Sequence, residues 1–293
     1  MTEVCRWCGT SLPLGSSREE FHVEWCGACG VGNTVPTPSS ADLDRAYSTW
    51  YRPEGGRFSG CGDVVLKRLR WRVALMVHRA SPPGPILDVG SGGGVMLDAF
   101  HRLGRVAVGL ERYADRPDVL TCDISECEYG WAAIVLWHSL EHLPAPRRAL
   151  REAALRLVPG GVVIVAVPNA ESIQARMFGD RWLHLDLPRH LTHLGSTHVE
   201  AALVEDGLTV TMVSHLRGGQ VAFGWLHGLV GLLPRHPDLY QAIRRPSARE
   251  RNGRRLPALL AAVGLGPVAL VAAGLEVWTR HGGTVCVMGR RTS

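Results

Sequence analysis

Four of the eight cysteines occur as two pairs near the start of the chain, and a glycine follows each pair. The pairs are Cys5–Cys8 and Cys26–Cys29, separated by seventeen residues. Two thiolates three positions apart on a tight turn can hold one side of a tetrahedral ion, and two such turns complete an all-sulfur site that suits Zn²⁺. The spacing therefore predicts a zinc ribbon over residues 1–34, with these ligands: Cys5, Cys8, Cys26 and Cys29.

The charge of this module limits what it can bind. Residues 1–40 carry four acidic and two basic side chains, a net charge of −2, and four thiolates on one Zn²⁺ add about −2 more. Nucleic-acid binding requires a basic face that displaces counterions from phosphate. We therefore expect the ribbon to be structural, or to cover a substrate site, and we expect no nucleic acid as a partner.

A glycine-rich turn, DVGSGGG at residues 88–94, ends an apolar run that reads as a strand. Its glycines let the backbone pass close to a ligand at a strand end, where open α/β sheets bind their ligands. The dinucleotide fingerprint is incomplete, because Val95 takes the position of its last glycine. Glu111 ends the next predicted strand, where a carboxylate can accept hydrogen bonds from both hydroxyls of a ribose.

Three histidines are candidates for acid–base chemistry. His138 and His142 follow the apolar run AAIVLW, with Glu141 between them, and His190 follows in a later loop with His193 close behind. The ordinary pKa of histidine suits a general base at neutral pH. Two alternatives stay open: Glu141 and His142 only orient their turn, or His138 is a wall of the site.

The elements that must position these residues alternate along the chain. Residues 62–80 have apolar residues at helical spacing, and from residue 85 to 217 strand patterns alternate with helix patterns. Residues 284–290 form a last predicted strand. Strands that alternate with helices at this spacing predict a mostly parallel sheet covered on both faces.

Several motifs together resemble one family. DVGSGGG, then VGLE, then LEHL, and LVPGG before a strand that ends in VPN are similar to class I S-adenosylmethionine-dependent methyltransferases. The stretches GDRW at 179–182 and LPRH at 187–190 resemble a segment of a narrower group. That group includes the ubiquinone-type O-methyltransferases and the sugar C-methyltransferases, and the latter also begin with a cysteine-rich zinc module.

The resemblance implies an α/β, Rossmann-like methyltransferase fold with a seven-stranded, mostly parallel sheet. It implies a linker at 35–61 and a methyltransferase domain at 62–293, with a helical insertion at 218–281. The methionine end of the cofactor would contact Asp88, Gly90, Gly92 and Gly94. Glu111 would bind the ribose, and Asp123 would lie beside the adenine. Asp123 follows Glu111 by only twelve positions, where the family usually fits a helix, so the adenine wall is thinner here.

On the acceptor side the resemblance leaves two hypotheses. His138, His142 and His190 are the candidate catalytic residues. Alternatively His138, Glu141 and His142 bind a divalent ion that orients a catechol, as such residues seem to do in the ubiquinone group.

The insertion at 218–281 is unusual in composition. Leu256–Leu275 contains no charged residue and has the length of a membrane span, while residues 244–255 hold six arginines and one glutamate. Pro257, Pro267 and the required return to the last strand disfavour a span. We expect a peripheral contact with the inner face of a membrane, with a buried lid or a dimer face as alternatives. The oligomeric state is not predicted. The start of the chain lacks a secretory pattern, which predicts a cytoplasmic protein.

These expectations combine into one function. The sequence predicts S-adenosylmethionine-dependent methyl transfer to a small-molecule acceptor, a hydroxyl or carbon of a saccharide or lipid-linked intermediate, with Zn²⁺ in a structural role. Two alternatives stay open, namely an rRNA or tRNA methyltransferase with a zinc ribbon and a non-enzymatic cofactor-binding scaffold.

Overall fold

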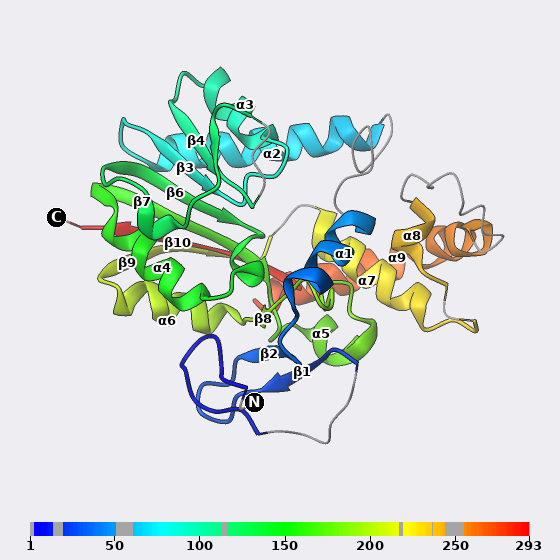
Figure 1. Ribbon diagram of the computed structural model, residues 1–293. Coiled ribbons are helices and arrows are strands. Elements are labelled where there is room, and N and C mark those ends of the chain that lie inside the picture. Colours follow the sequence, from blue (N-terminus) through cyan, green and yellow to red (C-terminus); the bar gives the residue numbers. More distant parts are fainter. Residues whose placement is uncertain are drawn as a thin grey trace.

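The computed structural model describes residues 3–13, 20–50, 61–112, 116–216, 219–235, 237–243 and 255–292. A seven-stranded sheet in the order β5-β4-β3-β6-β7-β10-β9 occupies the left half of Figure 1. Its strands are β3 (Ile86–Val89), β4 (Ala107–Leu110), β5 (Val119–Leu120), β6 (Trp131–Trp137), β7 (Leu157–Pro168), β9 (Leu208–Ser214) and β10 (Thr284–Arg291). The predicted α/β fold with a seven-stranded sheet is confirmed.

Strands β3 to β7 pair in parallel, and β10 lies antiparallel between β7 and β9. Because parallel strands end at the same edge of a sheet, the residues that follow β3, β4 and β6 are brought together. These residues are Gly90, Glu111 and His138. The topology alone therefore gathers the glycine turn, one carboxylate and one histidine at one edge.

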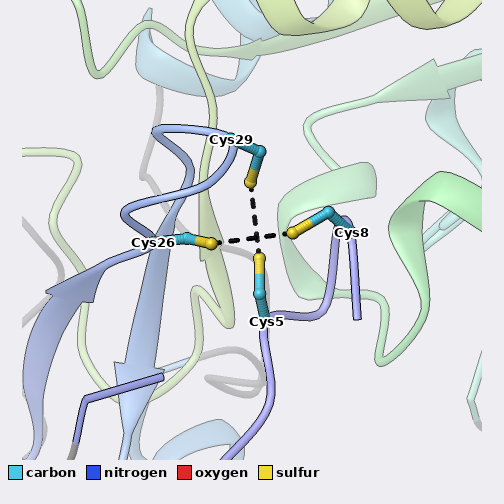
Figure 2. A group of neighbouring side chains, drawn as sticks. All are labelled: Cys5, Cys8, Cys26 and Cys29. Atoms are coloured by element: carbon cyan, nitrogen blue, oxygen red, sulfur yellow. Dashed lines mark hydrogen bonds between the residues drawn. The ribbon is translucent and has the colours of Figure 1, made fainter. Parts of the chain in front are cut away.

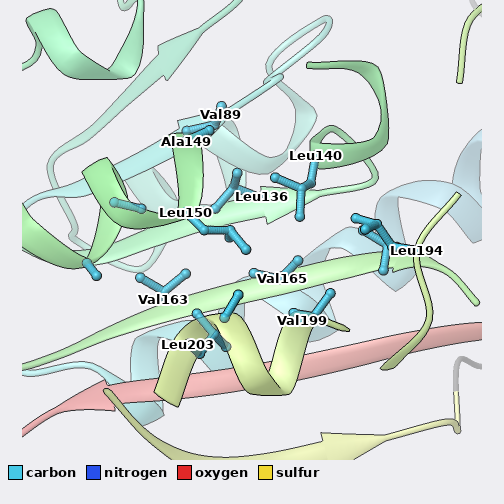
Figure 3. Packing of buried hydrophobic residues seen from close by; sticks show 14 of the residues in the cluster. Val89, Leu136, Leu140, Ala149, Leu150, Val163, Val165, Leu194, Val199 and Leu203 are labelled. Carbon is cyan, nitrogen blue, oxygen red and sulfur yellow. The ribbon is translucent and has the colours of Figure 1, made fainter. Parts of the chain in front are cut away.

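Helices cover both faces of this sheet. Helices α2 (Cys61–Ala80) and α3 (Val95–Arg102) pack on one face, and α4 (Pro146–Leu155) and α6 (Ser196–Glu205) pack on the other. Figure 3 shows part of the second core, in which Leu150 of α4 and Leu203 of α6 meet strand side chains. All seven residues of β6 are buried. The run AAIVLW lacks alternation because both of its faces are covered.

The N-terminal module contributes to a second, three-stranded sheet. Strands β1 (His22–Trp25) and β2 (Gly32–Val35) form a hairpin, and β2 also pairs with β8 (Thr192–His193). Figure 1 shows this hairpin in blue below α5 (Ile173–Phe178). The boundary at residue 34 stays a prediction, since β2 runs one residue further and its sheet continues into the later chain.

The predicted linker contains one helix, α1 (Ser40–Trp50). Ser39 and Asp42 cap its start reciprocally: Asp42 N donates to Ser39 Oγ at 3.2 Å, and Ser39 N donates to Asp42 Oδ2 at 2.9 Å. Residues 51–60 of the predicted linker lie outside the described residues. Three short 3₁₀ helices complete the described methyltransferase region: η1 (Ile124–Glu126), η2 (Leu140–His142) and η3 (Gly179–Arg181).

Helices fill the insertion before β10, as predicted. They are α7 (Gly219–Gly231), α8 (Leu239–Ile243) and α9 (Arg255–Trp278), on the right of Figure 1. Among the described residues, one helix is long and apolar enough to cross a membrane, at Leu256–Trp278, and 17% of its most apolar window is buried. The arginines from Arg244 to Arg254 lie outside the described residues.

Candidate functional site

The four predicted metal ligands converge on one point (Figure 2). Cys5 Sγ lies 3.6 Å from Cys29 Sγ, and Cys8 Sγ lies 3.6 Å from Cys26 Sγ. All four sulfur atoms lie within 4.8 Å of one another. Tetrahedral zinc with Zn–S bonds of about 2.3 Å requires sulfur–sulfur separations of roughly 3.8 Å. The four thiols therefore fit Zn²⁺.

Two similar turns hold these thiols. Gly9 N donates to Cys5 O at 2.9 Å, and Gly30 N donates to Cys26 O at 2.8 Å. Both glycines have a φ that disfavours a side chain, +77° at Gly9 and +76° at Gly30. Asn33 Nδ2 donates to Cys5 Sγ at 3.4 Å, a contact that favours a thiolate.

The glycine turn and Glu111 meet at the cofactor edge of the sheet. Gly92 N donates to Glu111 Oε2 at 2.8 Å, and Arg112 N donates to Glu111 Oε1 at 2.9 Å. Gly90, Gly92 and Gly94 all have positive φ. A Cβ on Gly90 would lie 2.4 Å from Ser139 Cβ, so only glycine fits at that close approach.

Asp88 lies beneath this turn and is 1% exposed. Its Oδ2 has no hydrogen-bond partner among the described residues. Burial raises the pKa of Asp88 to about 7; Arg70 opposes this shift and Glu111 adds to it. A buried carboxylate oxygen without a donor is costly, and a bound ammonium or hydroxyl would relieve that cost. S-adenosylmethionine carries both groups, so the residues present fit this cofactor.

Asp123 has a local structural role. Its side chain is exposed and caps η1, where Oδ1 accepts from Ser125 N at 2.9 Å and from Ser125 Oγ at 2.6 Å. These bonds lower the pKa of Asp123, against burial. The two-residue strand β5 precedes Asp123 in the chain, and the thin adenine wall stays a prediction. A contact between Asp123 and adenine stays a prediction.

Glu141 brings the three predicted catalytic histidines together. Its Oε1 lies 3.5 Å from His138 Nδ1 and 4.0 Å from His190 Nε2. The rings of His142 and His190 meet edge to face, with centroids 4.7 Å apart. Asp186 Oδ2 lies 3.6 Å from His190 Nε2. His138 has a φ of 55°, which is uncommon outside glycine and is often found at functional sites.

Burial keeps His190 neutral and disfavours the ionised form of Glu141. It raises the pKa of Glu141 to about 7, with His142 opposing the shift and Asp186 adding to it. It also lowers the pKa of His190 well below its ordinary value, and the neighbouring His142 and His193 lower it further. A neutral imidazole is the form that can accept a proton. The cluster therefore offers a base at neutral pH.

Comparison with known proteins identifies the family of this chain. A family model described as a methyltransferase domain matches residues 65–213, which is half of the chain. The chain belongs to this methyltransferase family. The predicted identification as an S-adenosylmethionine-dependent methyltransferase is thereby confirmed at the level of the domain.

The curated relatives of this methyltransferase are more distant. The ubiquinone biosynthesis O-methyltransferase of Paracidovorax citrulli is 26% identical over 141 residues, which cover 41% of this chain and 57% of that protein. The enzyme of the same name from Shewanella halifaxensis is 24% identical over 157 residues, or 47% of this chain and 64% of that protein. The chain thus spans about three fifths of the length of these relatives.

Solved structures of methyltransferases are similar to this chain at low sequence identity. The Burkholderia thailandensis 1,6-didemethyltoxoflavin-N1-methyltransferase, solved with S-adenosylhomocysteine, is 13% identical with a TM-score of 0.48 and covers 95% of this chain and 99% of its own. A SAM-dependent methyltransferase from Archaeoglobus fulgidus is 11% identical with a TM-score of 0.45 and covers 79% and 100%.

The set of candidate metal ligands on the acceptor side differs in the structure from the predicted set. Glu141, His142 and His190 place their ligand atoms within 4.8 Å of one another, and His138 is not in this group. His142 Nδ1 donates to Arg189 O at 2.8 Å, and His190 Nδ1 donates to His184 O at 2.8 Å. These bonds leave Nε2 of both rings as an acceptor. Neither oxygen of Glu141 has a hydrogen-bond partner among the described residues.

A groove of about 740 Å³ adjoins the cluster. It runs between strand β1 and residues 175–187, and Asp186 and His193 line it beside Phe21, Trp25 and Trp182. Trp182 is 5% exposed, and its Nε1 has no partner among the described residues. Charged groups in the lining are mostly acidic, with Glu20, Asp180 and Asp186 against Arg176.

Several of these residues were missed from the sequence. Asp186 adjoins the LPRH motif, so its position was readable in principle. No sequence pattern pointed to Thr34 or to Gln220. The Thr34 hydroxyl contacts the backbone of His190, and Gln220 Nε2 lies 3.4 Å from His138 Nε2. Both come from distant elements, β2 and α7, and only the folded chain brings them to the cluster.

Proposed function

We propose that this protein transfers a methyl group from S-adenosylmethionine to a hydroxyl or carbon of a small molecule, with a saccharide or a lipid-linked intermediate as the favoured acceptor class. The proposal rests chiefly on one observation: the histidines around Glu141, among them the buried His190, lie at the same sheet edge as the buried carboxylate of Asp88. Methyl transfer requires both a cofactor site and a dry acceptor site at one edge.

The roles on the cofactor side are assigned from the resemblance to class I methyltransferases, and the burial of Asp88 supports them. Asp88 would accept from the methionine end, Glu111 would accept from the ribose hydroxyls, and the glycine turn would let the cofactor approach. Asp123 would lie beside the adenine. The bound cofactor supplies an electrophilic methyl group on a sulfonium, and the chain supplies orientation and exclusion of water.

On the acceptor side, His190 would act as the base. Its Nδ1 proton is committed to His184 O, so Nε2 carries the lone pair that accepts the acceptor's proton. The carboxylate of Asp186, at 3.6 Å, would stabilise the resulting imidazolium. His138 and His142 would orient the acceptor or share the proton through Glu141.

The groove beside β1 supports a small acceptor. Its aromatic side chains suit the apolar face of a ring, and its polar side chains suit hydroxyl groups. The acidic excess disfavours a nucleic-acid backbone. Incubation with tritiated S-adenosylmethionine and cell extract, divided into RNA, lipid and small-molecule fractions, tests this: label in the small-molecule or lipid fraction is expected, and label in RNA alone would overturn the proposal.

A divalent ion at Glu141, His142 and His190 is a second candidate, favoured by the two Nδ1–carbonyl bonds described above. Such an ion would bind an acceptor oxygen and lower its pKa. Methyl transfer that is lost with a chelator and regained with Mg²⁺ or Zn²⁺ would favour it. Retained cofactor binding without any turnover on any fraction would instead favour a non-enzymatic scaffold.

We also propose that Zn²⁺ in the four-cysteine site is structural. A closed all-thiolate site contributes folding free energy directly and leaves no position for substrate. Elemental analysis is expected to find one zinc per chain, in addition to any ion held by the histidine cluster. A metal-free protein with four titratable thiols in this module would contradict the assignment.

The insertion would attach a cytoplasmic enzyme to an anionic membrane surface without crossing it. Large apolar side chains of α9 are exposed, including Val263 at 80% and Leu270 at 66%. Helix α8 packs on the first half of α9 through Leu239 and Ala258. The six arginines at 244–255 follow α8 in the chain, and each arginine near an anionic leaflet contributes about 1 kcal/mol.

The far end of α9 is fixed to the enzyme. Glu276 is fully buried and accepts from Trp225 Nε1 at 2.8 Å and from Gln174 N at 2.9 Å. Helix α7, which packs along α9, has only 13 residues, or about 20 Å, and is too short to span. These contacts favour an interfacial position over a span.

Co-sedimentation with liposomes tests the membrane contact. The protein is expected to pellet with vesicles rich in phosphatidylglycerol at low salt and to stay in the supernatant with neutral vesicles. The variant Val263→Glu, on an exposed position of α9, is expected to weaken pelleting, and Val106→Glu, exposed on another part of the protein, is the matched control. Equal recovery of all three proteins in the supernatant would contradict the membrane contact. The insertion would then be interpreted as a buried lid or a dimer face.

A further inference from the structure

Strand β2 connects the four-cysteine module to the acceptor side. Its Asn33 is fully buried, and Nδ2 donates to Cys5 Sγ at 3.4 Å. On its other side, Asn33 pairs with Thr192 and Gly32 pairs with His193 in antiparallel register. One short strand therefore touches both the thiol site and β8, the strand that carries His193.

Thr34 makes the closest link to the histidines. Its Oγ1 donates to His190 O at 2.5 Å and lies 3.2 Å from His193 Nε2. The single hydroxyl proton is used on the carbonyl, so the oxygen must accept from Nε2–H of His193. One hydroxyl thus holds the backbone at His190 and fixes the tautomer of His193, with Nδ1 left as the acceptor.

The loop between these histidines is held from two sides. On one side, Thr34 N donates to Leu191 O at 3.0 Å. On the other, Leu191 N donates to Glu141 O at 2.8 Å, and His142 donates to the carbonyl of Arg189. Removal of β2 would leave η2 as the remaining support for this part of the loop. Its His190 is the proposed base, so its position depends on the module.

The tautomer of His193 matters because this residue lines the groove beside β1. His193 is 4% exposed, and burial lowers its pKa to about 4, so the ring is neutral at physiological pH. A neutral ring with Nε2–H fixed presents Nδ1 as a hydrogen-bond acceptor for a donor such as a hydroxyl group.

We propose that Thr34 is a positioning residue and that the four-cysteine module, through β2, sets the geometry of His190 and the tautomer of His193 on the acceptor side. The module is then part of the active site as well as a folding unit. This inference rests on the proposed function only in treating His190 and His193 as part of an acceptor site. The coupling between the four-cysteine module and these histidines is measurable without an acceptor.

The experiment compares Thr34→Val, which keeps the shape and loses the hydroxyl, with Thr34→Ser, which keeps the hydroxyl. Thr192→Val is the matched control, because the Thr192 hydroxyl is buried one strand away and has no partner among the described residues. Each full-length, zinc-loaded protein is examined by ¹⁵N imidazole NMR for the His193 tautomer, by elemental analysis for zinc, and by calorimetry with S-adenosylhomocysteine.

Wild type, Thr34→Ser and Thr192→Val are expected to show the Nε2–H tautomer at His193, and Thr34→Val is expected to show a mixture. Zinc content should be unchanged, and affinity for S-adenosylhomocysteine should stay within about twofold, because the cofactor side has no contact with Thr34. Once an acceptor is known, Thr34→Val should lower kcat about tenfold or more with KM for the cofactor unchanged.

An unchanged tautomer in Thr34→Val would overturn the proposal. If that variant fails to fold, chelation of zinc from the wild-type protein decides instead. Hydrogen exchange over 189–193 should then accelerate at least tenfold while β3 and β4 stay protected, and unchanged exchange over 189–193 would also overturn it. Failure of wild type to bind S-adenosylhomocysteine would count against the proposed function and leave the coupling result standing.

Discussion

The cofactor side and the acceptor side of this site are assembled differently. Asp88, the glycine turn and Glu111 come from two consecutive strand ends, and the hydrogen bonds of Glu111 with Gly92 and Arg112 lie within residues 88–112. The acceptor side draws on β2, η2, the loop at 184–193 and α7. The hydrogen bonds of the first join neighbouring strand ends, whereas those of the second reach β2 of the four-cysteine module over long range. A substitution on one side should therefore affect that side far more than the other.

The largest separation is expected from loss of a metal ligand. Cys26 is buried, and Cys26→Ser should abolish zinc binding, which contributes roughly 10 kcal/mol or more to the folding of such modules. Hydrogen exchange should show loss of protection in β1, β2 and β8 with β3, β4 and β6 unaffected. Cys286→Ser removes a buried cysteine of the sheet and is the control for thiol removal. Global unfolding of Cys26→Ser, but not of Cys286→Ser, would show that the cofactor side and the acceptor side are not separable.

Loss of the histidines should affect turnover far more than cofactor binding. His190→Ala and His138→Ala are expected to lower kcat by roughly 10²–10⁴-fold, the usual effect of removing a general base. Affinity for S-adenosylhomocysteine should change little. Single-turnover kinetics with the acceptor measure this. His101→Ala, at an exposed position of α3 outside the groove, is the comparison variant. Near wild-type rates in both active-site variants would make these histidines structural.

The buried Glu141 gives the acceptor side a pH dependence. Its folded pKa, about 7, lies above its ordinary value of 4.5, so stability is fully present below about pH 4.5 and declines as the pH rises to 7. Glu141→Gln does not ionise and should be more stable than wild type by roughly 2–3 kcal/mol at pH 8, with a smaller difference at pH 5. Urea unfolding at several pH values measures the difference, and a pH-independent difference would contradict the burial of an ionisable group.

The smallest effect is expected at Asp123. If its exposed carboxylate meets the adenine, Asp123→Ala should weaken S-adenosylhomocysteine binding about threefold, the effect of one solvent-accessible hydrogen bond. Glu128→Ala, exposed in the same loop region, should bind as wild type does. Indistinguishable affinities for both variants would confine Asp123 to its role as the cap of η1.

The proximity of the glycine turn and Glu111 could be predicted from the sequence because its determinants are local. An apolar strand, a glycine turn and an acid at the next strand end each leave a pattern within a few residues, and parallel pairing then brings them together. The four cysteines were readable for the same reason, since each pair lies on its own turn. The alternating strands and helices likewise predicted a mostly parallel sheet, and the resemblance to methyltransferases implied its seven strands.

The acceptor side was predicted only in part. The histidines were identifiable by type, but their convergence on Glu141 requires the loop at 184–193 to fold back onto η2. Thr34 looked like an ordinary strand residue, because the pairing of β2 with β8 links segments far apart in the sequence. Neither the periodicity of the sequence nor its composition predicts such a pairing between segments that are far apart in the chain.

The most direct test of this account is calorimetric titration of S-adenosylhomocysteine into wild type, Asp88→Ala, Glu111→Ala and the control Glu205→Ala, whose carboxylate lies outside the cofactor edge. Loss of a charge-assisted hydrogen bond costs about 1.5–3 kcal/mol. We predict one binding site in wild type, affinity weakened at least tenfold in Asp88→Ala and Glu111→Ala, and no change in Glu205→Ala. Equal affinity in all four proteins would contradict the assignment of the cofactor side.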